Sequence, residues 1–95
     1  MSSQVDHFKK IILDILKNHE VKRASLFGSI VRGEMTYDSD IDILIEFKGK
    51  KSLLDLAGLK IEMEEKLKRK VDVLTYDSLH PLLKEHILAE QVEIL

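Results

Sequence analysis

Residues 40–47, with the sequence DIDILIEF, alternate strictly between two kinds of side chain. Successive side chains of a β-strand point to opposite sides, so this alternation predicts a strand with one buried face. Three isoleucines and Phe47 form the apolar side, and the other side carries Asp40, Asp42, Leu44 and Glu46. A chain that contains such a strand must cover the isoleucines with a second layer of structure.

The sequence before this strand predicts a helix, a strand and a short helical turn. An apolar stripe over residues 5–16 predicts an opening helix that ends near Asn18. The β-compatible residues 21–27 predict a strand that runs into a turn at Gly28. A brief helical turn over residues 29–32 is expected to follow.

A second long helix is predicted after the alternating strand. Ser52 and Asp55 have the spacing of a capping box, which marks the start of a helix that reaches about Arg69. Its inner face is expected to consist of five apolar side chains: Leu53, Leu56, Leu59, Met63 and Leu67.

A third strand and a last helix complete the predicted order. The segment KVDVLTY, residues 70–76, predicts the strand. The helix would be capped by Asp77 or Ser78 and would carry Pro81 in its first turn. Its expected inner face consists of four residues: Leu82, Leu83, Ile87 and Leu88. The order αβαβαβα, with three or four strands, predicts a small layered sheet rather than a doubly wound one.

The composition argues against several classes of protein. Ninety-five residues are enough for one domain, so residues 1–95 are expected to form a single unit. A formal charge of −2 argues against a free-standing nucleic-acid-binding protein, and the absence of cysteine excludes thiol catalysis and Cys-type zinc sites. No apolar run approaches roughly 18 residues, and the first ten residues lack a signal-peptide pattern. We therefore expect a soluble, cytoplasmic protein.

Asp40 and Asp42 are two residues apart on the predicted strand, so they point to the same side, roughly 7 Å apart at the backbone. At this distance two ionised carboxylates repel each other by about 2 to 3 kcal/mol at an effective dielectric constant of about 20. A divalent metal ion would relieve the repulsion, and hard oxygen ligands suit Mg²⁺ or Mn²⁺. Alternatively, the pair is a solvated strand edge.

Gly28 and Ser29 lie where the first predicted strand turns into the short helix. Gly28 permits close approach of the backbone, and the amide groups at the helix start face outward together with the Ser29 hydroxyl. This arrangement is a natural seat for a phosphate group opposite the acidic pair. An ordinary strand-to-helix turn is the alternative, since Gly-Ser turns are common.

Asp72 offers a third carboxylate, because its valine neighbours can face the core while Asp72 points to the opposite side. If its strand lies beside that of Asp40 and Asp42, three acids can hold two cations about 3.5 to 4 Å apart. The alternative is a strand residue that simply faces water.

Gly28-Ser29, ten intervening residues and Asp40-Ile41-Asp42 resemble the GSx10DxD signature of the DNA polymerase β-like nucleotidyltransferase superfamily. The segments GSIVRGE, SDIDILIEF and KVDVL agree with it, and the resemblance continues through the two predicted helices after the alternating strand. The chain looks most like the minimal nucleotidyltransferases, the MntA-type proteins that are paired with HEPN toxins.

This resemblance implies an α+β fold in which a small mixed β-sheet is covered by helices. It implies that Asp40 and Asp42 are active-site acids and metal ligands, with Asp72 as a third metal ligand. It implies that Gly28 and Ser29 bind the nucleotide phosphates. ATP would be the substrate and Mg²⁺ the cofactor, with two ions bound and Mn²⁺ as a substitute.

The implied reaction is transfer of AMP to a tyrosine hydroxyl of a cognate HEPN toxin, an RNase, so that this protein is the antitoxin of a hetero-oligomer. Contact with a membrane or directly with nucleic acid is not expected. Nucleotidyl transfer needs positioned charge more than covalent help, and Asp72 could take the proton of the tyrosine. Two alternatives stay open: an antitoxin that only binds its partner, and the catalytic subunit of a small-molecule nucleotidyltransferase.

Arg32 and the histidines are left outside the predicted site. Arg32, one helical turn past Ser29, could reach phosphate oxygens or could pair with Glu34 or Asp38 instead. The four histidines lack the spacing of metal ligands, so surface or capping roles are expected for them.

Overall fold

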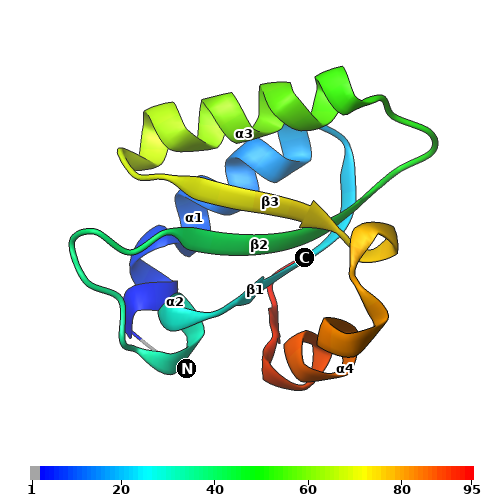
Figure 1. The fold of residues 1–95 in the computed structure, drawn as a ribbon. Coiled ribbons are helices and arrows are strands. Elements are labelled where there is room, and N and C mark those ends of the chain that lie inside the picture. Colours follow the sequence, from blue (N-terminus) through cyan, green and yellow to red (C-terminus); the bar gives the residue numbers. More distant parts are fainter. Residues whose placement is uncertain (1–2) are drawn as a thin grey trace.

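The computed structural model describes residues 3–95, with side chains from Asp6 onward, so Val5 of the predicted stripe lies outside the described side chains. Figure 1 shows helices and strands that alternate along the chain. Their bounds are α1 (Ser3–Asn18), β1 (Val21–Phe27), α2 (Ser29–Arg32), β2 (Ile41–Phe47), α3 (Leu53–Leu67), β3 (Val71–Thr75), a 3₁₀ turn η1 (Tyr76–Ser78), α4 (Pro81–Glu90) and β4 (Val92–Glu93).

The strands form one mixed sheet in the order β3-β2-β1-β4. β1 pairs antiparallel with β2 and with β4, whereas β2 and β3 are parallel. The predicted α+β class with a small mixed sheet is therefore confirmed. The structure adds β4 to the predicted order; with only two residues it is too short to show a periodic pattern.

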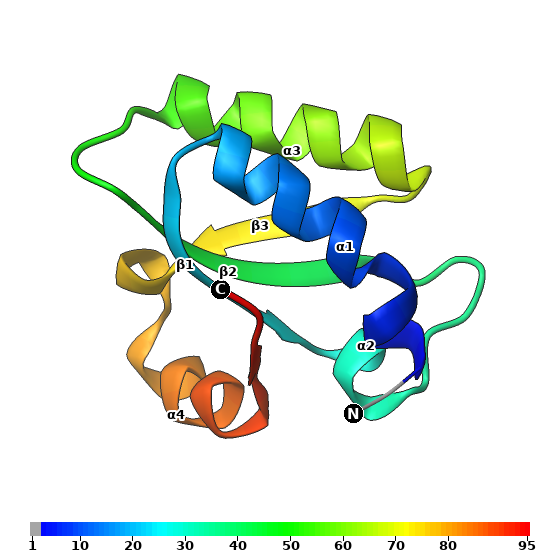
Figure 2. The ribbon, with the colours of Figure 1, turned by 180° about the vertical axis from the view of Figure 1, so that it is seen from behind.

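One face of the sheet is covered by α1 and α3, which contact each other and the strands beneath them (Figure 2). The molecule is only 21 Å across in its shortest dimension, which is about the thickness of one helix layer on one sheet. The apolar side of β2 forms the centre of this core, because its isoleucines are completely buried. The buried core residues that surround them include Ile12, Ile15, Leu16, Leu26, Ile30, Leu59 and Met63.

The capping box at the start of α3 is present as predicted. The Ser52 backbone N–H donates to Asp55 Oδ2 at 2.8 Å, and the Asp55 backbone N–H donates to Ser52 Oγ at 3.4 Å. The prediction that Leu53 belongs to the inner face is wrong, since its side chain is 83% exposed. The buried positions of α3 lie in its later turns, where the helix contacts α1 and β3.

The last helix differs from its prediction in two respects. His80, rather than Asp77 or Ser78, caps α4, with His80 Nδ1 accepting from the Leu82 backbone N–H at 3.1 Å. α4 also contains no buried residue, and Leu82 is 85% exposed. The physical reason is that α1 and α3 already cover the apolar face of the sheet, so α4 has no apolar surface of that kind to bury. Among residues 3–95, no helix is long and apolar enough to cross a membrane.

Candidate active site

The three predicted acids lie on the face of the sheet opposite to α1 and α3. Asp42 of β2 and Asp72 of β3 are paired directly in the parallel register, and Asp40 immediately precedes β2. Parallel pairing in register gives both aspartates the same side of the sheet, because their neighbours Ile41, Ile43 and Val71 are buried on the other. The structure therefore brings together the acids that the sequence placed 30 residues apart along the chain.

The ionisation of Asp42 is strongly affected by its surroundings. Partial burial, the negative charges of Asp72 and Asp40 and a hydrogen bond with Asp72 together raise its pKa to about 6, with burial the largest cause. The positive charge of Arg32 acts in the opposite direction. The carboxylate of Asp42 is therefore held where its negative charge is unfavourable, which is typical of a site that binds a cation or moves a proton.

The chemistry of these side chains fits a hard divalent cation. Carboxylate oxygens are the ligands that Mg²⁺ and Mn²⁺ prefer, and a cation between Asp42 and Asp72 would offset their repulsion. Within the part of the chain that the structure describes, no three His, Asp or Glu side chains converge as a formed metal site. The three acids are thus adjacent. To coordinate one cation jointly, their side chains would have to rotate toward it.

Gly28 lies directly against Asp42. Its φ of +79° and ψ of −151° are readily adopted only by glycine. A β-carbon at this position would also overlap the Oδ2 atom of Asp42. Both the backbone conformation and the contact thus require glycine here, and the β1–α2 turn passes immediately beside the acids.

Ser29 begins α2, as predicted, and its side chain is partly exposed beside this turn. Among the described residues the Ser29 hydroxyl has no hydrogen-bond partner. Its backbone carbonyl accepts from the Glu34 N–H at 3.0 Å and from the N–H of the cap residue Gly33. The backbone of the turn is therefore fixed, while the hydroxyl is available for a ligand.

A carboxylate from the end of α4 reaches this same turn. The Gly28 backbone N–H donates to Glu90 Oε1 at 2.7 Å, and Arg32 Nη1 donates to the same oxygen at 2.8 Å. Arg32 Nε also donates to Glu34 Oε2 at 3.0 Å, which is the ion pair that the sequence had offered as an alternative to phosphate binding. Asp38, the other partner considered, makes no ion pair with Arg32 in the described part of the chain.

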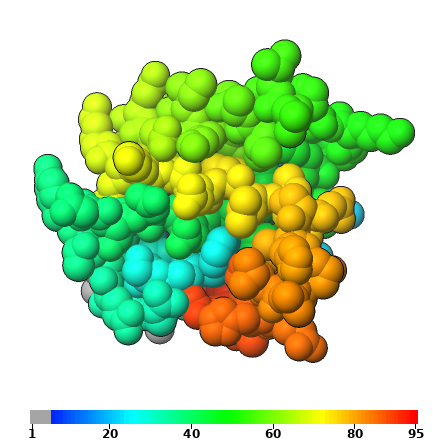
Figure 3. All heavy atoms as spheres, viewed as in Figure 1, coloured from blue at the N-terminus to red at the C-terminus, as the bar shows by residue number. Residues whose placement is uncertain are grey.

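Figure 3 shows how these segments meet on the open face, with β1 and α2 in cyan, β3 in yellow and the end of α4 in red-orange. Glu90 was not among the residues predicted from the sequence. Glycine 28 and Glu90 are 62 residues apart, and no local pattern marks a glutamate at the end of a helix as a partner of a distant turn.

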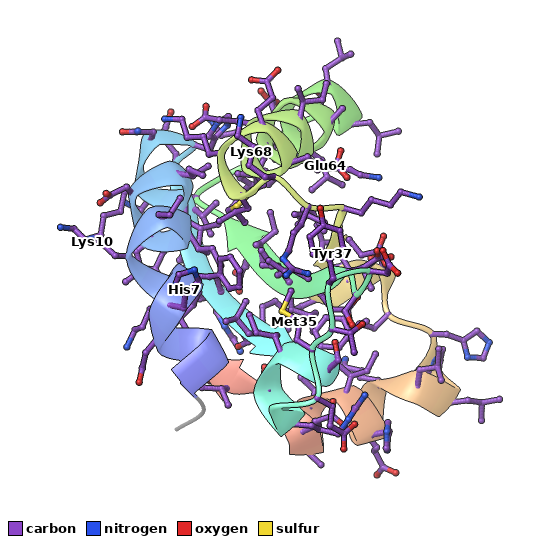
Figure 4. All side chains as sticks on the ribbon, turned by 90° about the vertical axis from the view of Figure 1, so that its left-hand side faces the viewer. His7, Lys10, Met35, Tyr37, Glu64 and Lys68 are labelled. Atoms are coloured by element: carbon purple, nitrogen blue, oxygen red, sulfur yellow. The ribbon has the colours of Figure 1, made fainter. Side chains whose placement is uncertain are left out.

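The loop between α2 and β2, which carries Asp40, is held in place by Arg69. Arg69 Nη1 donates to the carbonyl oxygens of Thr36 at 2.8 Å, Tyr37 at 3.2 Å and Ser39 at 3.3 Å. A hollow of about 340 Å³ lies beside this loop and is lined in part by Asp40. Figure 4 shows Tyr37 in this loop, with Lys68 at the end of α3 above it.

A larger hollow of about 920 Å³ contains none of the three acids. It lies toward the other end of β2 and β3 and is lined by residues of β2, the start of α3, η1 and α4. Beside it, Tyr76 donates or accepts a 2.8 Å hydrogen bond with the buried Ser25 hydroxyl, and the Arg23 guanidinium lies 4.2 Å from the centre of the Tyr76 ring. The size of this hollow does not make it the catalytic centre, because the groups able to bind metal and phosphate lie elsewhere.

Comparison with known proteins agrees with the sequence signature. Residues 9–95 match the family described as polymerase beta, nucleotidyltransferase. The protein MJ0435 of Methanocaldococcus jannaschii, provisionally named a protein adenylyltransferase, is 57% identical over 96% of this chain and 98% of its own length. The protein adenylyltransferase MntA of Thermococcus cleftensis is 38% identical over 78% of this chain and 75% of its own length.

Solved structures share the fold. The structure of a protein provisionally described as a minimal nucleotidyltransferase matches with a TM-score of 0.81 and 34% identity, covering 97% of this chain and 95% of that one. A complex of a tri-AMPylated HEPN toxin with an MNT antitoxin from Shewanella oneidensis contains a chain that matches with a TM-score of 0.74 and 18% identity. That match covers 95% of this chain and 71% of the other. At this low identity the second comparison concerns the fold alone.

Proposed function

The chain belongs to the polymerase beta nucleotidyltransferase family, and from this premise we propose that it is an antitoxin that acts as an Mg²⁺-dependent protein adenylyltransferase. It transfers AMP from ATP to a tyrosine hydroxyl of a cognate HEPN RNase toxin. Transfer of a nucleotidyl group is what the family performs, whereas the nucleotide, the metal and the acceptor are the parts that we propose.

One observation carries the proposal: the in-register pair Asp42 and Asp72, with Asp40 beside it, lies against the glycine turn at Gly28. Nucleotidyl transfer requires negative ligands for a cation and hydrogen-bond donors for phosphate within one small region. The open face of the sheet supplies both, because the acids are adjacent to a backbone N–H that already binds a carboxylate.

The relatives support the choice of a protein acceptor. MJ0435 and MntA are both named for adenylylation of protein, and the chain covers three quarters or more of each. In the Shewanella oneidensis complex the toxin is AMPylated and is bound to an MNT antitoxin. A toxin that docks on the open face would bring its tyrosine to the acids, which are on the uncovered side of the sheet.

Each residue of the site has a defined part in this reaction. Asp40, Asp42 and Asp72 would hold Mg²⁺, which, when bound, lowers the pKa of an attacking hydroxyl and neutralises charge on the phosphates. The backbone N–H of Gly28 and the hydroxyl of Ser29 would donate to phosphate oxygens. Asp72, the most exposed of the three acids, would accept the proton of the tyrosine hydroxyl, whose ordinary pKa is about 10.

The test is to incubate the protein with ATP labelled in its α-phosphate, Mg²⁺ and the HEPN protein encoded beside it. We expect label on a tyrosine of the HEPN protein and loss of its RNase activity. The D40N and D42N variants should give no label. Glu46→Gln is a matched control on the same strand, since Glu46 only makes surface ion pairs with Lys22 and Arg23, and this variant should label normally.

Two outcomes would replace the proposal by one of its alternatives. Tight binding and inhibition of the HEPN protein without label would mean an antitoxin that acts by contact alone. Transfer of AMP to a small molecule, with none to the protein, would mean the catalytic subunit of a small-molecule nucleotidyltransferase.

A further inference from the structure

Glu90 holds a position that the proposed function reserves for a phosphate. One of its carboxylate oxygens, Oε1, accepts from the Gly28 backbone N–H at 2.7 Å and from Arg32 Nη1 at 2.8 Å. The other oxygen, Oε2, lies 3.8 Å from His86 Nε2. The Glu90 side chain is only 20% exposed, so this carboxylate is inserted into the site rather than extended into water.

A carboxylate and a phosphate are recognised by the same donors. Both offer negatively charged oxygens, and both form short charge-assisted hydrogen bonds with a guanidinium and with backbone N–H groups. The Gly28 N–H and Arg32 Nη1 both donate to a single oxygen of Glu90, so together they form one binding site for an anionic oxygen. This binding site lies beside the acids, because Gly28 is in contact with Asp42.

The helix that carries Glu90 is otherwise weakly attached. α4 contains no buried residue, and Leu82 and Leu83 in its first turn are 85% and 56% exposed. Beyond the contacts of Glu90, the segment after α4 is held by a 3.4 Å hydrogen bond from Tyr76 to Gln91, by the pairing of β4 with β1 and by Ile94, which is buried in the core. Because residues 81–90 contribute no buried side chain, α4 can shift while β4 and Ile94 keep their places in the sheet and the core.

We propose that Glu90 takes the place of a nucleotide phosphate oxygen when no nucleotide is bound, and that a phosphate of a nucleoside triphosphate displaces it. Arg32 and the Gly28 N–H then donate their hydrogen bonds to the phosphate instead of the carboxylate. This inference rests on the proposed function, and it makes Arg32 a phosphate-binding residue. Glu90 has to leave because a carboxylate that remained there would repel the phosphate and occupy its donors.

The first test measures the affinity for Mg²⁺-ATP by titration calorimetry in wild type and in Glu90→Gln. Glu90→Gln removes the competing charge, so it should bind ATP at least about fivefold more tightly, because a competing state lowers apparent affinity in proportion to its population. Glu85→Gln is the matched control. It removes the same charge from an exposed position of α4 that makes no ion pair in the described part of the chain, and its affinity should equal that of wild type.

Arg32→Gln completes a double-mutant cycle. It should weaken ATP binding in the wild-type background and weaken it more in the Glu90→Gln background, where the competitor is already absent. If Glu90→Gln leaves the affinity unchanged or lowers it while the wild type still transfers AMP, Glu90 merely anchors α4, and the inference falls while the proposed function stands. If the wild type neither binds ATP nor labels the HEPN protein, both are wrong.

A second test uses the wild-type protein and does not depend on the folding of a variant. Hydrogen exchange of residues 81–90 is measured with and without saturating Mg²⁺-ATP. Displacement of Glu90 predicts faster exchange of these amides when ATP is bound. Unchanged or slower exchange in a protein that binds ATP would show that the end of α4 stays in place, and would overturn the inference.

Discussion

The two faces of the sheet differ in the burial and charge of their side chains, and adjacent residues of β2 show the difference. Ile43 points into the face covered by α1 and α3 and is completely buried. Asp42 points to the open face, where partial burial and two neighbouring acids raise its pKa to about 6. The covered face is built from apolar side chains that stabilise the fold. The other face also buries Leu44 and Ser25, but it carries a crowded carboxylate, Asp42, whose charge opposes folding.

This contrast agrees with the proposed function, which uses the acids of the open face. Carboxylates crowded beside one another cost stability in the absence of a cation, and the proposed function accounts for this cost. We therefore expect that changes to the acids of the open face affect activity and leave the fold intact, while changes to the buried side chains of the covered face do the reverse.

The largest effect is expected for Asp42→Asn. Loss of a metal-binding charge should lower the rate of AMP transfer by about 10³-fold, since a bound cation supplies several kcal/mol of transition-state stabilisation. The free energy of unfolding at pH 7 should be unchanged or higher by about 1 kcal/mol, because repulsion with Asp72 and Asp40 is relieved. Label transfer and urea denaturation measure the two effects. More than a tenth of the wild-type rate would contradict the assignment.

Ile43→Ala is the opposite change at the adjacent position. Removing this completely buried side chain should lower the free energy of unfolding by about 3 to 4 kcal/mol, through lost burial and the cavity left behind. The rate of AMP transfer per folded molecule should stay within about threefold of wild type. A loss of less than about 1 kcal/mol, or a rate as low as that of Asp42→Asn, would break the separation of the two faces.

Gly28→Ala tests the point where the open face touches the backbone. The positive φ of Gly28 should cost about 1 to 2 kcal/mol of stability in any L-residue, and the β-carbon must also displace the Asp42 carboxylate. Gly49→Ala is the control, because Gly49 has a similar φ of +74° but no atom within 4 Å of a β-carbon. Both variants should be destabilised, and only Gly28→Ala should lose AMP transfer. Equal activity in the two would show that contact with Asp42 is unimportant.

The smallest effect is the pH dependence of stability. Asp42 has a pKa of about 6 in the folded protein and 3.8 as its ordinary value, so between these values the folded state binds more protons than the unfolded state. Its contribution to stability is therefore fully present below about pH 4 and is lost as the pH rises to about 6. We expect the loss to be about 1 kcal/mol, since water screens a half-buried carboxylate.

This dependence appears as a difference between wild type and Asp42→Asn in urea denaturation at pH 4 to 7, with metal ions removed. The variant should gain stability over wild type as the pH rises from 4 to 6. A constant difference across this range would mean that the pKa of Asp42 is not raised.

Much of the fold could be predicted because it follows from local patterns. The alternation in β2 and the capping box at Ser52 depend only on neighbouring residues, and both appear in the structure as expected. The grouping of Asp42 with Asp72 required a further condition, that their strands be adjacent, and the parallel pairing of β2 with β3 meets it.

What the sequence did not predict depends on contacts between distant segments. The inner face expected for α4 is wrong at Leu82 and Leu83, which are exposed, while Ile87 and Leu88 are partly buried. The apolar face of the sheet is already covered by α1 and α3, and this cannot be read from the sequence of α4 itself. The cap at His80 was missed because aspartate and serine are more common at that position. Glu90 was missed because its partners at Gly28 and Arg32 are reached only when the chain has folded.

The central claim is that the acids of the open face together hold a divalent cation with a nucleotide. The most direct measurement is Mn²⁺ binding, followed by electron paramagnetic resonance in the presence of ATP, in wild type, Asp42→Asn, Asp72→Asn and the Glu46→Gln control. The account predicts bound Mn²⁺ in wild type and the control, and at least a tenfold weaker affinity in both aspartate variants. Equal Mn²⁺ binding in all four proteins would contradict it.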